Sequence, residues 1–137
     1  MGPEVFIDTS GFYALLVRGD DRHRHATDFM REAALRKRRF VTTDYVLDET
    51  ATLLQARGRT GVVPRFFDSV FGSRACRVLW MDPERFDRTR ALFVGRLGQR
   101  WSFTDCLSFV VMKELRLREA LTKDTHFRSA SFVALLA

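Results

Sequence analysis

The chain has 137 residues, of which 46% are hydrophobic and 13 are phenylalanine, and 23 Lys plus Arg against 17 Asp plus Glu give a net charge of +6. This composition excludes intrinsic disorder, no uncharged run approaches the ~20 residues of a membrane span, and Glu4 and Asp8 interrupt the early apolar stretch that a signal peptide would need. Cys76 and Cys106 are too few for a zinc knuckle or a disulfide framework, so we expect a reduced, soluble, cytoplasmic protein without membrane contact.

Short apolar runs alternate with stretches of helical periodicity along the chain. In the first half, the run at residues 5–7 predicts a buried strand, and the polar residues Asp8, Thr9 and Ser10 after it favour the start of a helix. Beyond that point we predict, in order, a helix over 22–38, a strand over 40–43, a helix from Asp44 to the terminating Gly58, and a helix over 63–71.

In the second half, residues 77–81 predict a third strand. Pro83 then favours a helix start, because proline at the first helical position loses no needed N–H, and this helix ends near Gly98. A further helix starts at Ser102 and is apolar on nearly every side over 106–112, which predicts that it is buried. Two short strands are predicted after it, over 120–122 and 132–136.

This alternation predicts an α/β fold with a largely parallel sheet that is covered on both faces. The chain has no internal repeat, low-complexity tract or Pro/Gly-rich linker, so we expect a single domain over residues 1–137. In such sheets, ligands bind outside the carboxyl ends of the strands, where the strand order reverses. The residues just after each strand are therefore the first candidates for a functional site, and Asp8 and Asp124 are among them.

Four carboxylates occupy positions where a surface charge is not expected. Asp8 ends the first strand, and Asp124 closely follows the strand at 120–122. Glu49 lies inside the helix that starts at Asp44, and Asp105 lies at the head of the most apolar helix.

Each of these acids also has an ordinary structural explanation. Asp8 can cap the helix that follows it, and Asp105 can pair with Ser102 in a capping box. Asp124 can be a turn aspartate, and Glu49 can face solvent beside its acidic neighbour. Taken singly, the acids fit these explanations better than a functional one.

Taken together, the acids indicate a metal site. If Asp8 and Asp124 lie on adjacent strands, their carboxylates share one edge of the sheet and need a counter-ion. Mg²⁺ or Mn²⁺ prefers such oxygen ligands and can activate water for attack on a phosphodiester. Arginine, which supplies nearly all of the positive charge, suits a phosphodiester backbone through its planar guanidinium, although a solvated arginine-rich surface explains the same composition.

The sequence resembles a PIN-domain ribonuclease, and within that group a VapC toxin of toxin–antitoxin pairs. The resemblance extends over essentially the whole chain, and its short motifs come in the expected order. These motifs are Phe6-Ile7-Asp8-Thr9-Ser10 with Leu15-Leu16 beyond, Asp20-Asp21 to His25-Ala26, Val46-Leu47-Asp48-Glu49-Thr50, Phe103-Thr104-Asp105-Cys106, and Leu121-Thr122-Lys123-Asp124-Thr125-His126-Phe127.

The resemblance implies a three-layer α/β/α fold with a parallel sheet in the order 3-2-1-4-5, which places the first and fourth strands side by side. It implies a Mg²⁺- or Mn²⁺-dependent endoribonuclease that cuts structured RNA such as tRNA or rRNA. It also implies homodimers and assemblies with a small VapB-like antitoxin. The tail of that antitoxin would fill a groove near Phe12, Tyr13 and Leu16, with an arginine reaching the acids.

The family's site residues carry over by position. Asp8 and Asp105 match the principal metal ligands, and Glu49 and Asp124 match the other acids. Thr104, or alternatively Ser102, matches a hydroxyl beside the site, and Thr9 matches a residue that helps to hold it. Lys123 departs from the family pattern, so we expect it either to touch phosphate or to pair with Asp124.

A second hypothesis is a non-catalytic RNA-binding or interaction module that keeps the same fold. It predicts salt-sensitive RNA binding without cleavage, and the presence of all four acids favours the nuclease instead.

The remaining histidines and tryptophans have ordinary explanations. His23 and His25 are expected to be solvated, or to form a basic loop that faces RNA, and His126 is expected to be a packing or turn residue. Trp80 and Trp101 are expected in the core or at an interface rather than as platforms for bases.

Overall fold

Five short strands form one parallel sheet in the computed structural model, which describes residues 3–137. Their order across the sheet is β3-β2-β1-β4-β5, and the first and fourth strands lie side by side, as predicted. Phe6 on β1 is in register with both Val41 on β2 and Ala120 on β4. The strands are β1 (Val5–Ile7), β2 (Phe40–Thr43), β3 (Cys76–Leu79), β4 (Glu119–Leu121) and β5 (Val133–Ala134).

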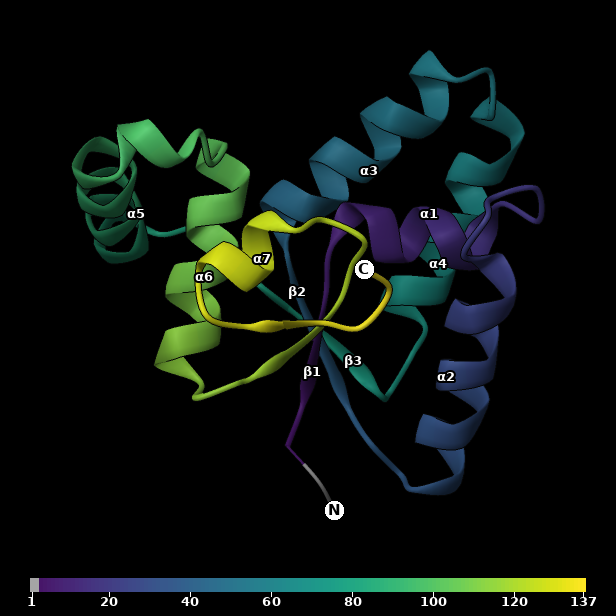
Figure 1. The fold of residues 1–137 in the computed structure, drawn as a ribbon. Helices are drawn as coiled ribbons and strands as arrows, with labels where there is room; N and C mark the ends of the chain where they lie inside the picture. The colour runs from purple at the N-terminus through teal and green to yellow at the C-terminus, as the bar shows by residue number, and fades with distance from the viewer. Residues whose placement is uncertain (1–2) are drawn as a thin grey trace.

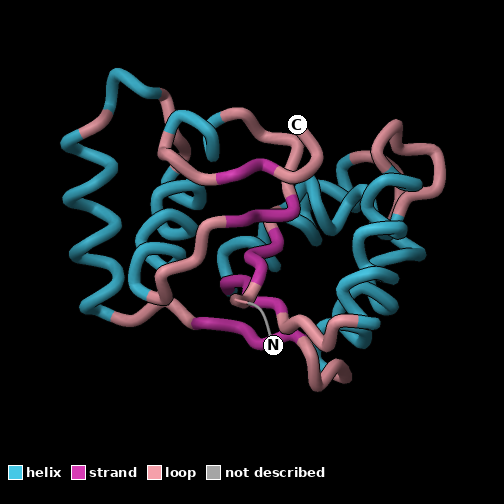
Figure 2. Tube along the Cα trace, turned by 60° about the horizontal axis from the view of Figure 1, so that its bottom comes forward, coloured by secondary structure: helices cyan, strands magenta, loops and turns pink. Residues whose placement is uncertain are grey.

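Helices cover both faces of this sheet, which confirms the expected three layers. In Figure 1, α1, α2 and α4 lie on one side of the strands and α5, α6 and α7 on the other, and Figure 2 shows the strands between the two groups. The helices change from one face of the sheet to the other because the chain adds β2 and β3 on one side of β1 and then crosses over to add β4 and β5 on the other side. The helices are α1 (Thr9–Leu16), α2 (His23–Leu35), α3 (Asp44–Ala56), α4 (Val63–Phe71), α5 (Pro83–Gly95), α6 (Phe103–Glu114) and α7 (His126–Ser129), with 3₁₀ turns at Thr60–Val62 and Leu97–Gln99.

The predicted elements all exist, and the differences lie at their ends. The helix predicted over 22–38 ends at Leu35, and the strand predicted over 132–136 pairs only at Val133–Ala134. The fourth strand ends at Leu121 and leaves Thr122 in the loop that follows, and the single-turn helix α7 has too few residues to show a periodicity in the sequence. Among residues 3–137, no helix is both long and apolar enough to cross a membrane.

The helix α6 is buried as predicted, and it forms a rigid base below the carboxyl edge of the sheet. Cys106, Leu107, Val111 and Met112 are fully buried. The Phe109 ring meets the Phe127 ring edge-on, with centroids 4.9 Å apart. Burying one such side chain contributes roughly 1.5–3 kcal/mol to folding, so the core fixes α6 firmly against the sheet.

Gly11 allows α1 to lie directly on the end of β4. A Cβ atom at this position would come within 2.1 Å of the Leu121 carbonyl oxygen and 3.3 Å of Ile7 Cγ2. The nearest obstacle is backbone, which cannot move aside without shifting β4. The missing side chain therefore brings the start of α1 against the carboxyl end of β4.

Because of this close approach, we expect Gly11→Ala to lower the free energy of unfolding by at least ~1–3 kcal/mol, the usual cost of overpacking. Urea denaturation followed by circular dichroism measures the change. Gly95→Ala is the matched control, because no atom lies within 4 Å of its added Cβ; it should leave the stability unchanged or raise it by up to ~1 kcal/mol. Equal stability of the Gly11 and Gly95 variants would contradict the close contact.

Candidate active site

The two central strands bring two of the predicted acids to one edge of the sheet. The strand order reverses at β1 and β4, which pair in parallel, and this is where ligands bind in open α/β sheets. Asp8 directly follows β1, and its backbone N–H donates to the Leu121 carbonyl at the end of β4 (3.2 Å). Asp124 lies three residues beyond Leu121. The geometry thus begins a candidate site at the position where the topology favours one.

Asp8 is a buried carboxylate that is only half satisfied. Its side chain bonds to Thr122 rather than capping α1, since Oδ2 accepts a hydrogen bond from Thr122 Oγ1 at 2.8 Å. Its other oxygen, Oδ1, is buried and has no hydrogen-bond partner among residues 3–137. A buried unpartnered carboxylate oxygen is costly, so this atom indicates a place for a ligand that binds oxygen.

The surroundings of Asp8 favour its neutral form. The pKa of this carboxyl is raised to about 7, chiefly by burial; hydrogen bonds from Thr122 and from the Thr9 backbone oppose the rise, and the carboxylates of Asp105 and Glu49 add to it. The neighbouring carboxylates place negative charge around Asp8, so a bound cation would stabilise the ionised form of this side chain.

Thr122 organises the site, although the sequence gives no sign of this role. Its hydroxyl has a single hydrogen, which it gives to Asp8. The same oxygen then accepts from the Asp124 backbone N–H (3.0 Å) and from Ser10 Oγ (3.0 Å), while Ser10 Oγ accepts from the Lys123 backbone N–H (2.8 Å). One hydroxyl thus links α1, β4 and the loop that carries Asp124.

Glu49 reaches the site from α3. That helix begins at β2, where the Thr43 hydroxyl accepts from the Val46 N–H (3.1 Å) and caps it. Glu49 is exposed, as its ordinary explanation predicts, but Oε1 accepts a hydrogen bond from Thr9 Oγ1 at 2.6 Å. Thr9 therefore orients Glu49, and its accessory role in the site stays a prediction.

Asp105 caps its helix and also faces the other acids. The predicted capping box is present, with the Ser102 hydroxyl accepting from the Asp105 N–H (2.9 Å) and Asp105 Oδ2 accepting from the Ser102 N–H (3.1 Å). Burial raises the pKa of Asp105, the Ser102 hydrogen bond lowers it, and the Asp124 carboxylate raises it again. The structural explanation is therefore correct, and the position of Asp105 beside Asp124 leaves its predicted role as a metal ligand open. Thr104, the adjacent residue, keeps only a predicted role.

His126 lies at a turn, as expected, and its side chain also lies beside two of the candidate acids. Its Nδ1 lies 3.3 Å from Asp105 Oδ2 and 3.5 Å from Asp124 Oδ1, and its backbone N–H donates to Asp124 Oδ1 (2.8 Å). One ligand atom from each of these three residues lies within 4.8 Å of the others. The signal in the sequence is the position of a histidine two residues after a strand-end aspartate.

Three of the four predicted acids line a common cavity of about 210 Å³. These acids are Asp8, Glu49 and Asp124. Asp124 also belongs to the cluster with Asp105 and His126, so it connects the two groups. The structure thus brings all four predicted acids to one edge of the sheet.

Lys123 pairs with two acids of another loop instead of with Asp124. Its ammonium group lies 3.1 Å from Asp20 Oδ2 and 2.9 Å from Asp21 Oδ1, rather than on Asp124. Partial burial would lower the pKa of Lys123, but its hydrogen bonds to Asp21 and Asp20 raise it on balance. This pair ties the loop between α1 and α2 to the loop that carries Asp124.

Arg57 is a cation at the rim of the same cavity. It lies at the C-terminal end of α3, and its guanidinium stacks over the Tyr13 ring at 4.8 Å from the centroid. Both residues line the cavity with Asp8 and Glu49. A cation held in this way can meet a phosphate that approaches the acids.

The other histidines and the two tryptophans lie outside the candidate site. His23 is half-buried, with Nδ1 2.7 Å from the Ala14 carbonyl oxygen, so the expectation of a solvated or RNA-facing ring is wrong for it. His25 is exposed. Trp101 lies in the core as expected, whereas Trp80 is 56% exposed.

The donor set of this site fits a hard divalent cation. It consists of carboxylate oxygens, one of them the buried and unpartnered Asp8 Oδ1, with a single imidazole at its edge. Mg²⁺ and Mn²⁺ are bound by such oxygen ligands, usually with several waters retained.

Comparison with known proteins gives a consistent family. The profile of the PIN domain matches residues 5–133. The 23S rRNA-specific endonuclease VapC20 of Mycobacterium tuberculosis is 32% identical over 130 residues, which cover 94% of this chain and 95% of that protein. A VapC ribonuclease of Archaeoglobus fulgidus is 28% identical over 125 residues, with 90% and 78% covered.

Solved structures agree on the fold. The crystal structure of Mycobacterium tuberculosis VapC20, described as a sarcin-ricin loop cleaving toxin, superposes with a TM-score of 0.83 at 28% identity and covers 95% of this chain and 97% of its own. PAE2754 from Pyrobaculum aerophilum superposes with a TM-score of 0.65 over 98% and 90% of the two chains, and at 18% identity it supports the fold alone.

The raised pKa of Asp8 predicts a pH-dependent stability of the metal-free protein. The folded chain keeps this proton up to about pH 7, whereas the unfolded chain loses it near pH 4, so the contribution of Asp8 to stability falls as the pH rises between these values. Asp8→Asn removes the titration. In EDTA, the free energy of unfolding of the Asp8→Asn variant minus that of the parent protein should therefore increase by roughly 2–3 kcal/mol from pH 5 to pH 8. Urea denaturation at both pH values tests this, and a constant difference would contradict it.

Proposed function

Because this chain belongs to the PIN domain family, we propose that it is a metal-dependent endoribonuclease that hydrolyses phosphodiester bonds of structured RNA. The observation that carries the proposal is the cluster of Asp8, Glu49, Asp105 and Asp124 at one sheet edge, with an unpartnered buried oxygen on Asp8. The similar proteins that are named as ribonucleases and endonucleases support the reaction class.

The four acids would hold a Mg²⁺ or Mn²⁺ ion. A bound ion of this kind lowers the pKa of water and offsets the charge of a phosphodiester under attack. Thr122 fixes the orientation of Asp8, and Thr9 fixes that of Glu49. Ordered ligands of this kind lose little freedom on binding, which favours a defined metal position.

We propose RNA as the substrate and the cytoplasm as the place of action. The excess of arginine supports contacts to the phosphate backbone, and Arg57 supplies such a cation beside the acids. The VapC20 proteins are named for 23S rRNA, so ribosomal RNA is the first substrate to test, with tRNA as the second.

We further propose that the chain is a toxin held inactive by a small antitoxin. An apolar groove of about 330 Å³ between α1, α2 and α4 supports a docking site for the antitoxin tail, and Phe12, Leu16 and Met30 line it. Tyr13, expected in the same groove, lies instead in the acidic cavity on the other side of α1. Homodimers and larger assemblies with the antitoxin remain part of this proposal.

The alternative of a non-catalytic RNA-binding module has less support. It offers no reason to bury an unpartnered carboxylate oxygen among other acids, an arrangement that costs stability.

The proposal predicts discrete RNA fragments that depend on metal and on Asp8. Purified protein is incubated with total cellular RNA in Mg²⁺, in Mn²⁺ and in EDTA, and the products are sequenced. We expect Asp8→Asn to lower the cleavage rate at least ~100-fold, because the buried metal ligand is lost. Thermal melting shows whether this variant is folded. Equal cleavage by the folded variant, or in EDTA, would overturn the proposal.

Arg57 is expected to raise the affinity for RNA without taking part in bond cleavage. Arg57→Gln should raise KM about 10-fold and change kcat less than about 2-fold, because one phosphate contact is lost. The slope of log KM against the logarithm of the salt concentration should fall by about one, the change expected when one phosphate contact is lost. Arg59→Gln is the control, an exposed arginine two residues further along the chain, and the prediction fails if both variants behave alike.

A further inference from the structure

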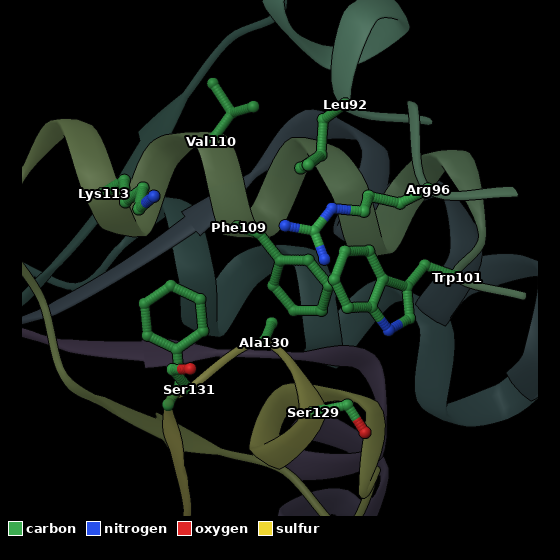
Figure 3. Close-up of a pocket in the computed structure, with 10 residues that line it drawn as sticks. Leu92, Arg96, Trp101, Phe109, Val110, Lys113, Ser129, Ala130 and Ser131 are labelled. Atoms are coloured by element: carbon green, nitrogen blue, oxygen red, sulfur yellow. The ribbon is translucent and has the colours of Figure 1, made fainter. Parts of the chain in front are cut away.

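A second and larger cavity lies further along α6 from the acids. It has a volume of about 370 Å³ and is bordered by α6, by α7 and by the segment that joins α5 to α6. Figure 3 shows its residues converging from these segments. Nothing in the proposed chemistry of the acids uses this cavity.

Aromatic rings form one wall of this cavity. The Phe109 and Phe132 rings are stacked, with centroids 5.7 Å apart and planes at 29°, and Trp101 meets Phe109 edge-on at 5.0 Å. Phe109 and Trp101 are buried, whereas Phe132 is half-buried. Phe132 therefore presents part of its ring to a flat ligand.

Two cations, Arg96 and Lys113, line the same cavity. Neither takes part in any ion pair among residues 3–137, whereas Arg85 and Arg88 on α5 are paired with Glu114. In Figure 3 the Arg96 guanidinium points over the Phe109 and Trp101 rings rather than away from the cavity. The cavity therefore combines an aromatic wall with unneutralised positive charge, which favours a ligand that has both a flat ring and an anionic group.

The cavity adjoins the acids through the two helices that they share. Phe109 lies one helical turn after Asp105 on α6, a rise of about 6 Å, and residues at this spacing share a helix face. Ser129, which lines the cavity, lies on α7 three residues after His126. A strand whose phosphodiester reaches Asp105 and Asp124 thus has the cavity within reach of a neighbouring nucleotide.

We propose that this cavity binds one nucleotide of the RNA substrate, next to the bond that is cut. The base would lie against the exposed part of the Phe132 ring, which Phe109 supports from behind, and Arg96 and Lys113 would contact its phosphate. Proteins commonly read unpaired bases of RNA loops by stacking them on aromatic side chains. This inference rests on the proposed function, and it names the part of the chain that selects the RNA strand. The apolar groove between α1, α2 and α4 is separate from it.

Intrinsic fluorescence tests the inference without cleavage. Trp80 and Trp101 are the tryptophans of this chain, so Trp80→Phe leaves Trp101, beside the cavity, as the reporter. In EDTA, we expect a saturable change in its emission with adenosine 5′-monophosphate and with a short single-stranded RNA. Inorganic phosphate should bind at least ~10-fold more weakly than the nucleotide.

Three variants in the Trp80→Phe background make the test specific. The double variant Arg96→Gln/Lys113→Gln should weaken nucleotide and RNA binding at least ~10-fold, and Phe132→Leu should remove the preference for nucleotide over phosphate. Arg90→Gln is the control, since this exposed arginine of α5 pairs with Asp87 away from the cavity. It should leave binding unchanged.

Several results would overturn the inference. They are no change in emission, equal binding by the double variant and the control, binding of the nucleotide without binding of RNA, or a response to an acidic peptide that exceeds the response to RNA. In cleavage assays, the double variant should raise KM for RNA at least ~10-fold with kcat nearly constant. Nucleotide binding without metal-dependent cleavage would instead contradict the proposed function, so the two failures are distinguishable.

Discussion

The hydrogen bond from the Thr122 hydroxyl to Asp8 links the carboxyl ends of the neighbouring strands β1 and β4, at the edge of the sheet where the candidate acids lie. Parallel pairing of β1 and β4 places Asp8 and Asp124 at one edge, where Asp105 and Glu49 add further negative charge beside Asp8. Thr122 donates to Asp8 and accepts from the backbone of Asp124. Gly11 permits the close approach of α1 that brings Ser10 to the same hydroxyl. The remaining contacts of the site are arranged around this small network.

The buried carboxylates of the site destabilise the folded state, and the burial of apolar side chains in the adjoining core compensates for this cost. Asp8 and Asp105 are buried among other acids, an arrangement that costs free energy when both are ionised. Phe109, Phe127 and Met112 are buried in the adjoining core, where the Phe109 and Phe127 rings meet edge-on. Local strain of this kind at a functional site, supported by a rigid scaffold, is the pattern expected for an active centre.

The sequence predicts the framework well, because short apolar stretches alternate with helical periodicity and because Thr43, Asp82 and Ser102 cap three of the helices. It locates Asp8 and Asp124 because both follow strands, but the strand order that makes them neighbours came from the family resemblance. Thr122 and His126 carry no periodic signal, and only the paired strands and the turn after β4 bring them to the acids. The partners of Lys123 were missed for the same reason, since Asp20 and Asp21 lie far from it along the chain.

The separation of the site residues along the chain has a consequence for biosynthesis. Asp8 and Thr122 are 114 positions apart, so the central network forms only after β4 has been made and has paired with β1. A chain that has not yet reached β4 therefore holds its first acid after β1 without the hydroxyl that orients it. The candidate site is complete only once the loop after β4 has been made, so it cannot assemble before most of the chain has been synthesised.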